Sequence, residues 1–194
     1  MGRILVLGLL VVLAALAAAP GSRSPVSWPS TASSPSAPVA GGPLGEADGA
    51  VPGGTTVFDD NIPGIAKLDA ALLDALRRAA ADAAGDGVAF VVDSGWRSPA
   101  YQEHLLDEAV QKYGSAAEAA RWVATPGTSA HVSGDAVDLG PAGAAWLSRH
   151  GAAYGLCRIY GNEPWHYELR PGAVARGCPA MYADPTHDPR MRQR

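Results

Sequence analysis

The chain has 194 residues, which is enough for one domain with terminal extensions. Its formal net charge is −4, and its isoelectric point of about 5.7 argues against a broad nucleic-acid-binding surface. Glycine (23 residues) and proline (16 residues) make up about a fifth of the chain. That share is too high for a chain that is helical or sheet-forming throughout, so we expect part of it to be linker.

Residues 1–19 predict an export signal. Arg3 precedes the uncharged stretch 4–19, which as a helix would be about 24 Å long and therefore shorter than the roughly 30 Å hydrocarbon core of a bilayer. Small residues end the stretch, and the triplet 15–17 (Ala-Leu-Ala) fits the cleavage pattern of a secretory signal peptide. The alternative is an uncleaved N-terminal anchor, and both interpretations export the rest of the chain.

The composition of residues 20–56 and 183–194 predicts disorder in both segments. Residues 20–56 hold seven prolines, seven serines and seven glycines, and they lack the apolar side chains that offset the entropy cost of ordering a chain. We expect a disordered linker there; the alternative is a small folded unit around Trp28. Residues 183–194 are expected to form a flexible tail, with Arg190 in solvent. One compact domain then remains, over residues 57–182.

Apolar spacing and turn residues in this domain predict a mixture of short helices and strands. Ile65, Leu68 and Leu72 recur at helical spacing, and Ser98 followed by proline is a helix-start signal. No regular alternation of strand and helix is apparent, which favours an α+β fold. The expected elements are a helix over 66–84, a strand over 88–92, helices over 99–113 and 115–124, a strand over 136–139, a helix over 142–153, and strands over 156–160 and 165–169.

Two short segments, SAHVSGDAVD and EPWHYE, contain the residues best suited to chemistry. Imidazole nitrogens and carboxylate oxygens are good zinc ligands, and a catalytic zinc takes three protein ligands while a fourth position stays open to water. His131, Asp138 and His166 can supply those three ligands. Gly134 permits the backbone turn that His131 and Asp138 need in order to converge.

A hydrolase also needs a general base beside its water molecule. Glu163 lies three residues before His166, and Pro164 disfavours the interior of a sheet, so we place Glu163 in a bend at the entrance of the last strand. Two other carboxylates compete for the role. Asp135 follows a turn glycine and is expected to be solvated, whereas Glu168 has the same strand parity as His166 and can support that side chain from behind.

These residues resemble a known family. The pattern S-x-H-x-x-G-x-A-x-D at 129–138, followed by E-P-W-H at 163–166, is similar to the zinc D-alanyl-D-alanine carboxypeptidases of the VanY type and to the related VanX dipeptidases. The segment Ser-Gly-Trp-Arg-Ser at 94–98, followed by Tyr101 and Gln102, resembles the upstream segment of that family. The three blocks occur in the expected order, and the resemblance spans roughly residues 57–170.

The resemblance implies a hedgehog/D,D-peptidase fold, which is an α+β domain with a small antiparallel sheet flanked by helices. It also implies one zinc ion per chain. The roles that it assigns are metal binding for His131, Asp138 and His166, general base catalysis for Glu163, substrate binding and oxyanion stabilisation for Arg97, and substrate binding for Ser129, Gln102 and Trp165.

The function implied is zinc-dependent hydrolysis of peptidoglycan stem peptides by a secreted, cell-wall-associated D,D-carboxypeptidase that removes the terminal D-alanine. We expect peptidoglycan peptides as partners, no nucleic acid, membrane contact only through an uncleaved N-terminal segment, and a monomer. The alternatives are an endopeptidase of the same fold, a non-catalytic zinc-containing cell-wall-binding module and a non-haem iron oxygenase. The presence of Glu163 argues against the binding module, and the lack of a close His-x-Asp spacing argues against the oxygenase.

Cys157 and Cys178 flank the segment EPWHYE. Because an exported chain with two cysteines usually pairs them, we expect a disulfide. It would close a loop that holds Glu163 and His166 and so brace the site; the alternative is a pair of free, buried thiols.

Overall fold

The computed structural model describes residues 44–192. The predicted signal or anchor at 1–19 and the part of the predicted linker before residue 44 lie outside the described residues. Within residues 44–192, no helix is both long enough and apolar enough to cross a membrane.

A four-stranded antiparallel sheet carries the fold, and its strand order is β1-β2-β4-β3. The register of the central pair places Asp138 opposite His166, and Asp138 also pairs with Ser94 on the other side. The sheet therefore brings two of the predicted metal ligands together across one strand pair. The strands are β1 (Val92–Ser94), β2 (Ala136–Leu139), β3 (Leu156–Arg158) and β4 (His166–Leu169).

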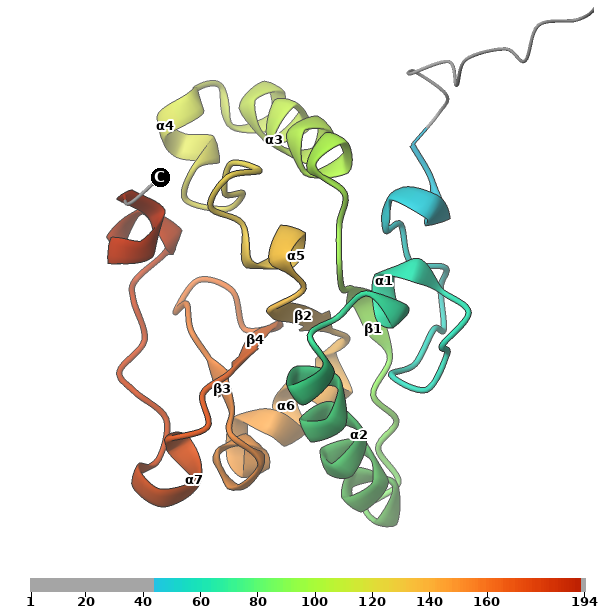
Figure 1. Cartoon of the computed structure of the whole chain (residues 1–194). Coiled ribbons are helices and arrows are strands. Elements are labelled where there is room, and N and C mark those ends of the chain that lie inside the picture. The colour runs from blue at the N-terminus through green and yellow to red at the C-terminus, as the bar shows by residue number, and fades with distance from the viewer. Residues whose placement is uncertain (1–43, 193–194) are drawn as a thin grey trace, which may run out of the picture. The chain divides into compact units, whose positions relative to one another are not determined.

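Helices flank both sides of the sheet, with α2 and α6 on one side and α3, α4 and α5 on the other (Figure 1). The α+β class with a small antiparallel sheet is thus confirmed. In the described part of the chain the α-helices are α1 (Pro63–Ala66), α2 (Ala70–Gly85), α3 (Pro99–Tyr113), α4 (Ala116–Ala119), α5 (Ala130–Ser133), α6 (Pro141–His150) and α7 (Ala173–Arg176). The 3₁₀ turns are η1 (Glu46–Asp48), η2 (Gly151–Tyr154), η3 (Pro185–His187) and η4 (Pro189–Arg192).

The hydrophobic core lies between α2, α6 and the sheet. Leu72 and Leu76 of α2 are fully buried, and they belong to one cluster with Val137 of β2, Tyr167 of β4 and Trp146 of α6. Burial of these side chains fixes β2 and β4 from one face, because each buried aliphatic or aromatic side chain stabilises the fold by roughly 1.5–3 kcal/mol. The opposite face of the same strands is free to carry polar residues.

The predicted elements are confirmed most closely where local signals are strong. The Ser98 side chain accepts a hydrogen bond from the Tyr101 amide and begins α3, which runs from Pro99 to Tyr113 as predicted. The predicted strand at 136–139 matches β2. The helix predicted over 66–84 begins later, at Ala70, because the side chain of Asp69 caps α2. The strand predicted over 88–92 differs from the structure, in which β1 covers Val92–Ser94.

Residues 44–56 are part of the folded unit, so the predicted linker is too long at its C-terminal end. The backbone carbonyl of Asp48 accepts a hydrogen bond from the Ser98 amide at 2.7 Å, and that of Thr55 accepts one from the Val92 amide at 2.8 Å. Gly49 has a φ of +104°, and a Cβ atom at this position would lie 2.1 Å from the Trp96 carbonyl oxygen. Backbone contacts that need glycine therefore dock a segment whose composition predicts disorder.

The predicted flexible tail is also ordered over residues 183–192. Asp184 and Asp188 are almost completely buried. Asp184 accepts hydrogen bonds from the amide and hydroxyl of Thr186, and it forms an ion pair with Arg121 at 3.0 Å. Polar contacts rather than apolar side chains hold this segment in place, which is why hydrophobic patterning predicts a flexible tail.

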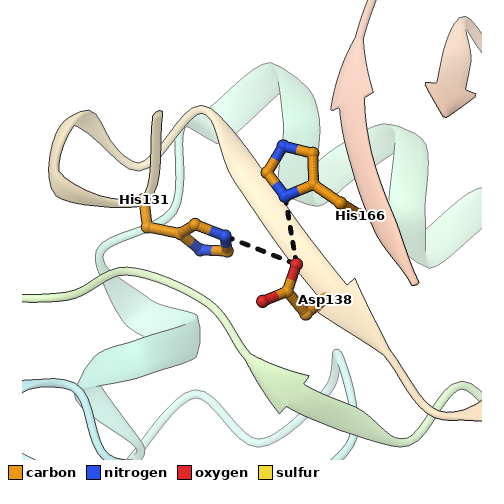
Figure 2. A group of neighbouring side chains, drawn as sticks. All are labelled: His131, Asp138 and His166. Atoms are coloured by element: carbon orange, nitrogen blue, oxygen red, sulfur yellow. Dashed lines mark hydrogen bonds and ion pairs between the residues drawn. The ribbon is translucent and has the colours of Figure 1, made fainter. Parts of the chain in front are cut away.

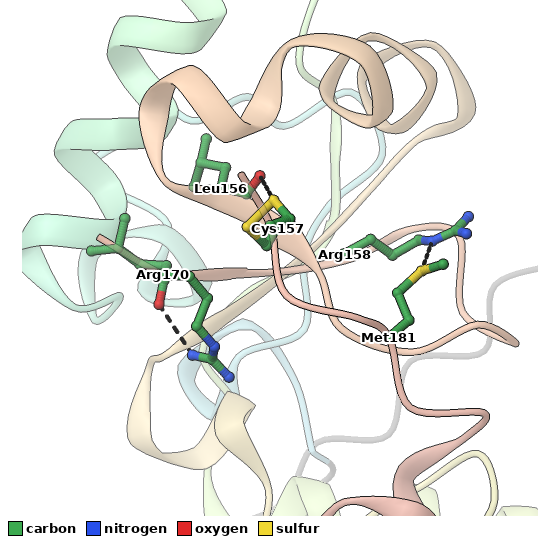
Figure 3. Close-up of a disulfide and its surroundings, with 7 residues drawn as sticks. Leu156, Cys157, Arg158, Arg170 and Met181 are labelled. Atoms are coloured by element: carbon green, nitrogen blue, oxygen red, sulfur yellow. Dashed lines mark hydrogen bonds between the residues drawn. A yellow bond between two sulfur atoms is a disulfide. The ribbon is translucent and has the colours of Figure 1, made fainter. Parts of the chain in front are cut away.

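A disulfide joins Cys157 of β3 to Cys178, as predicted (Figure 3). Cys157 is fully buried, and the backbone carbonyl of Leu156 lies 3.7 Å from the Cys178 sulfur. The bridge links the sheet to the chain that leads into the C-terminal segment. The loop that it closes includes Glu163 and His166.

Candidate active site

His131 reaches the site from a short helix that ends in a sharp turn. The Ser129 hydroxyl accepts a hydrogen bond from the His131 amide at 3.3 Å and caps α5. Gly134 ends α5 with a φ of +81°, and a Cβ atom there would lie 2.6 Å from the Lys67 carbonyl oxygen. Glycine is thus required both by the turn and by the close packing, and the turn leads the chain directly into β2 and Asp138.

The three predicted metal ligands meet at one point (Figure 2). The Asp138 Oδ1 atom lies 3.4 Å from His131 Nε2 and 3.1 Å from His166 Nδ1. One ligand atom from each of the three residues lies within 4.8 Å of the others, and all three side chains are buried. Two imidazole nitrogens and one carboxylate oxygen are a donor set that suits zinc, so the residues present fit a divalent metal ion.

The outer nitrogen of each imidazole has its own partner. His131 Nδ1 lies 2.8 Å from the Gly95 carbonyl oxygen, which leaves Nε2 facing Asp138. His166 Nε2 lies 3.3 Å from Glu168 Oε1, which leaves Nδ1 facing Asp138. Such outer contacts fix the tautomer and the ring orientation of metal-binding histidines. They also bear out the expectation that Glu168 supports His166 from behind.

The electrostatics of the cluster favour a cation between the three side chains. Burial opposes ionisation of Asp138, but the neighbouring His131 and the hydrogen bonds from both histidines hold the pKa of Asp138 well below its ordinary value. Burial likewise disfavours the imidazolium form of His166, yet hydrogen bonds to Asp138 and Glu168 raise the pKa of His166 to about 10. Burial lowers the pKa of His131. The Asp138 carboxylate is therefore ionised, and it attracts positive charge on the sides that face His131 and His166.

Glu163 lies beside this cluster, in the predicted bend before β4. Its Oε2 atom is 3.8 Å from His166 Nδ1, whereas its buried Oε1 atom has no hydrogen-bond partner within residues 44–192. Burial raises the pKa of Glu163 to about 7. A buried carboxylate oxygen without a partner is costly unless it serves a ligand or a reaction, so Glu163 is well placed to exchange a proton with a bound water.

Arg97 lies on the other side of Asp138 and is not a surface residue, since its side chain is only 13% exposed. Its Nη2 atom donates to Asp138 Oδ2 at 2.9 Å, and its Nε atom donates to the Ser94 hydroxyl at 2.8 Å. Gln102 is buried, accepts a hydrogen bond from Arg97 Nη1 at 3.1 Å, and donates one to the Ala124 carbonyl at 2.8 Å. These contacts hold the guanidinium at the edge of the metal cluster.

A cavity of about 300 Å³ opens in front of the cluster. Trp165, which is 39% exposed, lies in its wall. The structure therefore brings all the predicted site residues to one cavity, whose lining includes the three metal-ligand candidates together with Glu163, Arg97, Gln102, Ser129 and Trp165.

Sequence reasoning missed the residues that hold Glu168. Arg190, assigned to the tail, donates from Nη1 to Glu168 Oε2 at 2.7 Å, and Arg170 donates to the same oxygen at 2.5 Å. The signal for Arg170 is its position two residues after Glu168, just beyond the end of β4. Nothing in the local sequence indicates Arg190, which lies 22 residues from its partner.

The sequence model of the family "VanY: D-alanyl-D-alanine carboxypeptidase" matches residues 65–171, more than half of the chain. The chain belongs to the VanY family. The matched range contains Arg97, both histidines of the cluster, Asp138 and Glu163, so the family match and the geometry indicate the same site.

Individual proteins are similar over shorter stretches. A D-alanyl-D-alanine carboxypeptidase of Enterococcus faecalis is 36% identical over 111 residues, which cover 44% of this chain and 41% of the relative. The chain thus spans about two fifths of that curated relative. A VanY D,D-pentapeptidase variant from a VanB-type resistance cassette, solved with Zn(II), is 32% identical with a TM-score of 0.49, over 53% of this chain and 72% of that one. VanYB in complex with D-alanine-D-alanine gives the same identity and TM-score, over 53% and 71%.

Proposed function

We propose that this VanY-family chain is a zinc-dependent peptidase that hydrolyses peptidoglycan stem peptides, and that it acts as a D,D-carboxypeptidase removing the terminal D-alanine. One observation carries the proposal most strongly. The buried cluster of His131, Asp138 and His166 shares a cavity with a partially neutralised carboxylate, Glu163, and an arginine, Arg97. Metal ligands, base and oxyanion donor are the complete set that peptide hydrolysis needs.

The metal site is proposed to hold one zinc ion through His131 Nε2, His166 Nδ1 and an oxygen of Asp138. A zinc ion held by three protein ligands lowers the pKa of a coordinated water towards about 7 and polarises a carbonyl group. The low pKa of Asp138 keeps its carboxylate available to the ion.

Glu163 is proposed to act as general base and then as general acid. Its unpartnered Oε1 atom accepts the proton of the attacking water and then donates that proton to the leaving amine. The raised pKa of Glu163, about 7, suits a group that must both accept and donate a proton near neutral pH. Asp135, the alternative base, is exposed and accepts a hydrogen bond from Ser133, so it is not proposed for this role.

Arg97 and Ser129 are proposed to bind the substrate at opposite ends of the scissile unit. The Arg97 guanidinium borders the metal cluster, which suits stabilisation of the oxyanion that develops on the peptide carbonyl. Ser129 accepts the His131 amide hydrogen bond through its oxygen, so its hydroxyl proton can be donated to the terminal carboxylate of a peptide. Gln102 is proposed to position Arg97, while Trp165 offers an apolar wall for the peptide.

The place of action is proposed to be outside the cytoplasm, at the cell wall. The disulfide between Cys157 and Cys178 suits an oxidising compartment, and the N-terminal segment resembles an export signal. The acidic balance of the chain gives no support to nucleic acid as a partner.

Mass spectrometry of the products from a pentapeptide that ends in D-Ala-D-Ala tests the proposal. The expected result is loss of one alanine, abolished by a chelator and restored by added zinc. Pentapeptides that end in D-Ala-L-Ala or in an amidated D-Ala serve as matched control substrates and should remain intact. Cleavage inside a cross-linked muropeptide with no release of terminal alanine would indicate the endopeptidase alternative. Zinc binding without cleavage of either substrate would indicate a binding module.

A further inference from the structure

We propose that Arg190, in the C-terminal segment 184–192, is a positioning residue for the metal site. It holds the carboxylate of Glu168, and Glu168 in turn holds the imidazole of His166 in the orientation needed for metal binding. This inference rests on the proposed function, because it assigns to the segment a part in building the zinc site of the peptidase.

The first step is the contact between Glu168 and His166. Both side chains come from β4, two residues apart, so they lie on the same face of the sheet. Glu168 Oε1 lies 3.3 Å from His166 Nε2, and the Glu168 side chain is only 1% exposed. With Nε2 held as a hydrogen-bond donor, Nδ1 is left facing Asp138. A rotation of the Glu168 carboxylate would remove the contact that selects this tautomer.

The second step is the contact between Arg190 and Glu168. Arg190 donates from Nη1 to Glu168 Oε2 at 2.7 Å and from Nη2 to Oε1 at 3.1 Å, so the guanidinium binds both carboxylate oxygens. Arg170 contacts Oε2 alone. A bidentate pair fixes the plane of the carboxylate, which a single contact cannot do. Arg190 therefore determines the orientation in which Oε1 meets His166.

The third step is the way in which Arg190 is itself held. Asp188, which is fully buried, accepts hydrogen bonds from Arg190 Nε at 2.8 Å and Nη2 at 2.5 Å. The same carboxylate accepts a hydrogen bond from the Tyr160 hydroxyl at 3.0 Å. The Tyr160 ring packs on the His166 ring, with 5.2 Å between centroids. The segment thus reaches His166 by two routes, a hydrogen-bond chain and a ring contact.

Charge explains why the segment carries an arginine at this point. Glu168 is buried, and an ionised buried carboxylate requires compensating positive charge. Arg190 and Arg170 supply that charge through ion pairs to Glu168 Oε2 at 2.7 Å and 2.5 Å.

The zinc dissociation constant, measured in the full-length protein by competition with a chromophoric chelator, tests the inference without recourse to activity. We expect R190Q to weaken zinc binding by about 10–100-fold, the usual effect of losing an outer partner of a metal ligand. R190K keeps the positive charge but cannot form the two parallel hydrogen bonds of a guanidinium, so its zinc affinity should lie between those of R190Q and the wild type. R192Q is the matched control in the same segment, because Arg192 is exposed and donates a hydrogen bond to the Thr186 carbonyl rather than to Glu168, and it should leave the affinity unchanged.

A double-mutant cycle separates positioning from general stability. If Arg190 acts through Glu168, R190Q should weaken zinc binding in the wild-type background and have little further effect in an E168Q background. The visible spectrum of the Co(II)-substituted protein should change in R190Q and in E168Q alike, and should not change in R192Q. Thermal unfolding of each metal-free variant shows whether the fold is retained.

The outcomes are distinct. Wild-type zinc affinity and an unchanged Co(II) spectrum in R190Q would overturn the inference and leave the proposed peptidase intact. Equal losses from R190Q in the wild-type and E168Q backgrounds would also overturn it, since the effect would then bypass Glu168. Failure of the unsubstituted protein to bind zinc would overturn the proposed function and the inference together.

Discussion

Asp138 of β2 and His166 of β4 are directly paired across the antiparallel sheet, and Asp138 Oδ1 lies 3.1 Å from His166 Nδ1. A shift of one residue in this register would turn either side chain to the opposite face of the sheet. The core packed beneath these strands, including Val137 and Tyr167, specifies the register. The geometry of the metal site is therefore a consequence of hydrophobic packing on the other face of the sheet.

The first prediction concerns Glu163. E163Q keeps the shape of the side chain but cannot accept the proton of water, so kcat on a D-Ala-D-Ala peptide should fall by about 10²–10⁴-fold. Zinc content should be unchanged, because Glu163 is not one of the three ligand candidates. D135N is the matched control, since Asp135 is an exposed carboxylate near the same site. A zinc-loaded E163Q protein with the wild-type rate would refute the assignment of the base.

The second prediction concerns Arg97. R97K retains positive charge but cannot reproduce the three contacts of the planar guanidinium to Ser94, Gln102 and Asp138. If Arg97 stabilises the oxyanion, kcat should fall by about 10²–10³-fold, the usual cost of losing one such donor. R149K, on the exposed side of α6, provides the control. Unchanged kcat/KM in R97K would exclude the role.

The third prediction concerns the disulfide between Cys157 and Cys178. The cysteines are 21 positions apart in the sequence, and closure of a loop of this size should stabilise the folded state by about 3 kcal/mol. The C157S/C178S double variant should therefore unfold at a lower denaturant concentration, as followed by circular dichroism. Thiol labelling of the unreduced, unfolded wild-type protein should detect no free sulfhydryl. Two reactive sulfhydryls in that sample would show that the bridge does not form.

The fourth prediction concerns acid stability and Asp184. Burial opposes ionisation of Asp184, but hydrogen bonds from Thr186, His187 and Arg121 lower the pKa of its carboxyl below the ordinary value of 3.8. The folded state thus binds the proton less tightly than the unfolded state does. The stability from this group is fully present above about pH 3.8 and is lost as the pH falls through the lower, folded-state pKa.

A series of thermal unfolding curves between pH 7 and pH 2 measures this effect. D184N should be less stable than the wild type at neutral pH and should lose less further stability on acidification. R121Q, which removes one of the hydrogen-bond donors, should flatten the acid slope in the same direction but less strongly. Parallel acid slopes for D184N and the wild type would contradict the role of Asp184.

Local sequence signals predict the elements that local chemistry determines. Ser98 and Pro99 predict the start of α3 because a cap and a proline act within one turn. The apolar run at 88–92 predicts a buried segment, but burial does not specify which amides pair. The structure begins β1 at Val92, whose amide donates to the Thr55 carbonyl and which pairs with Leu139 of β2. The choice of candidate site residues depends mainly on the resemblance of the segments 94–98, 129–138 and 163–166 to a known family, and the roles of these residues stay predictions.

The C-terminal segment was not predictable, because its contacts are long-range and polar. Arg121 donates a hydrogen bond to Asp184, 63 residues away in the sequence, and Arg190 donates one to Glu168, 22 residues away. Polar residues with few apolar neighbours are typical of disordered tails, and composition cannot distinguish them from residues that satisfy a buried charge. Residues 44–56 were missed for the same kind of reason, since backbone hydrogen bonds dock them and backbone bonds leave little trace in side-chain patterns.

His131, Asp138 and His166 are proposed to hold one zinc ion. The most direct measurement is an anomalous-difference map, collected on crystals of the zinc-loaded protein on both sides of the zinc absorption edge. The expected result is one edge-dependent peak per chain, bonded to both imidazoles and to the Asp138 carboxylate, and no such peak in D138N crystals treated in the same way. A peak at another position, or no peak beside these three side chains in the loaded wild-type protein, would contradict it.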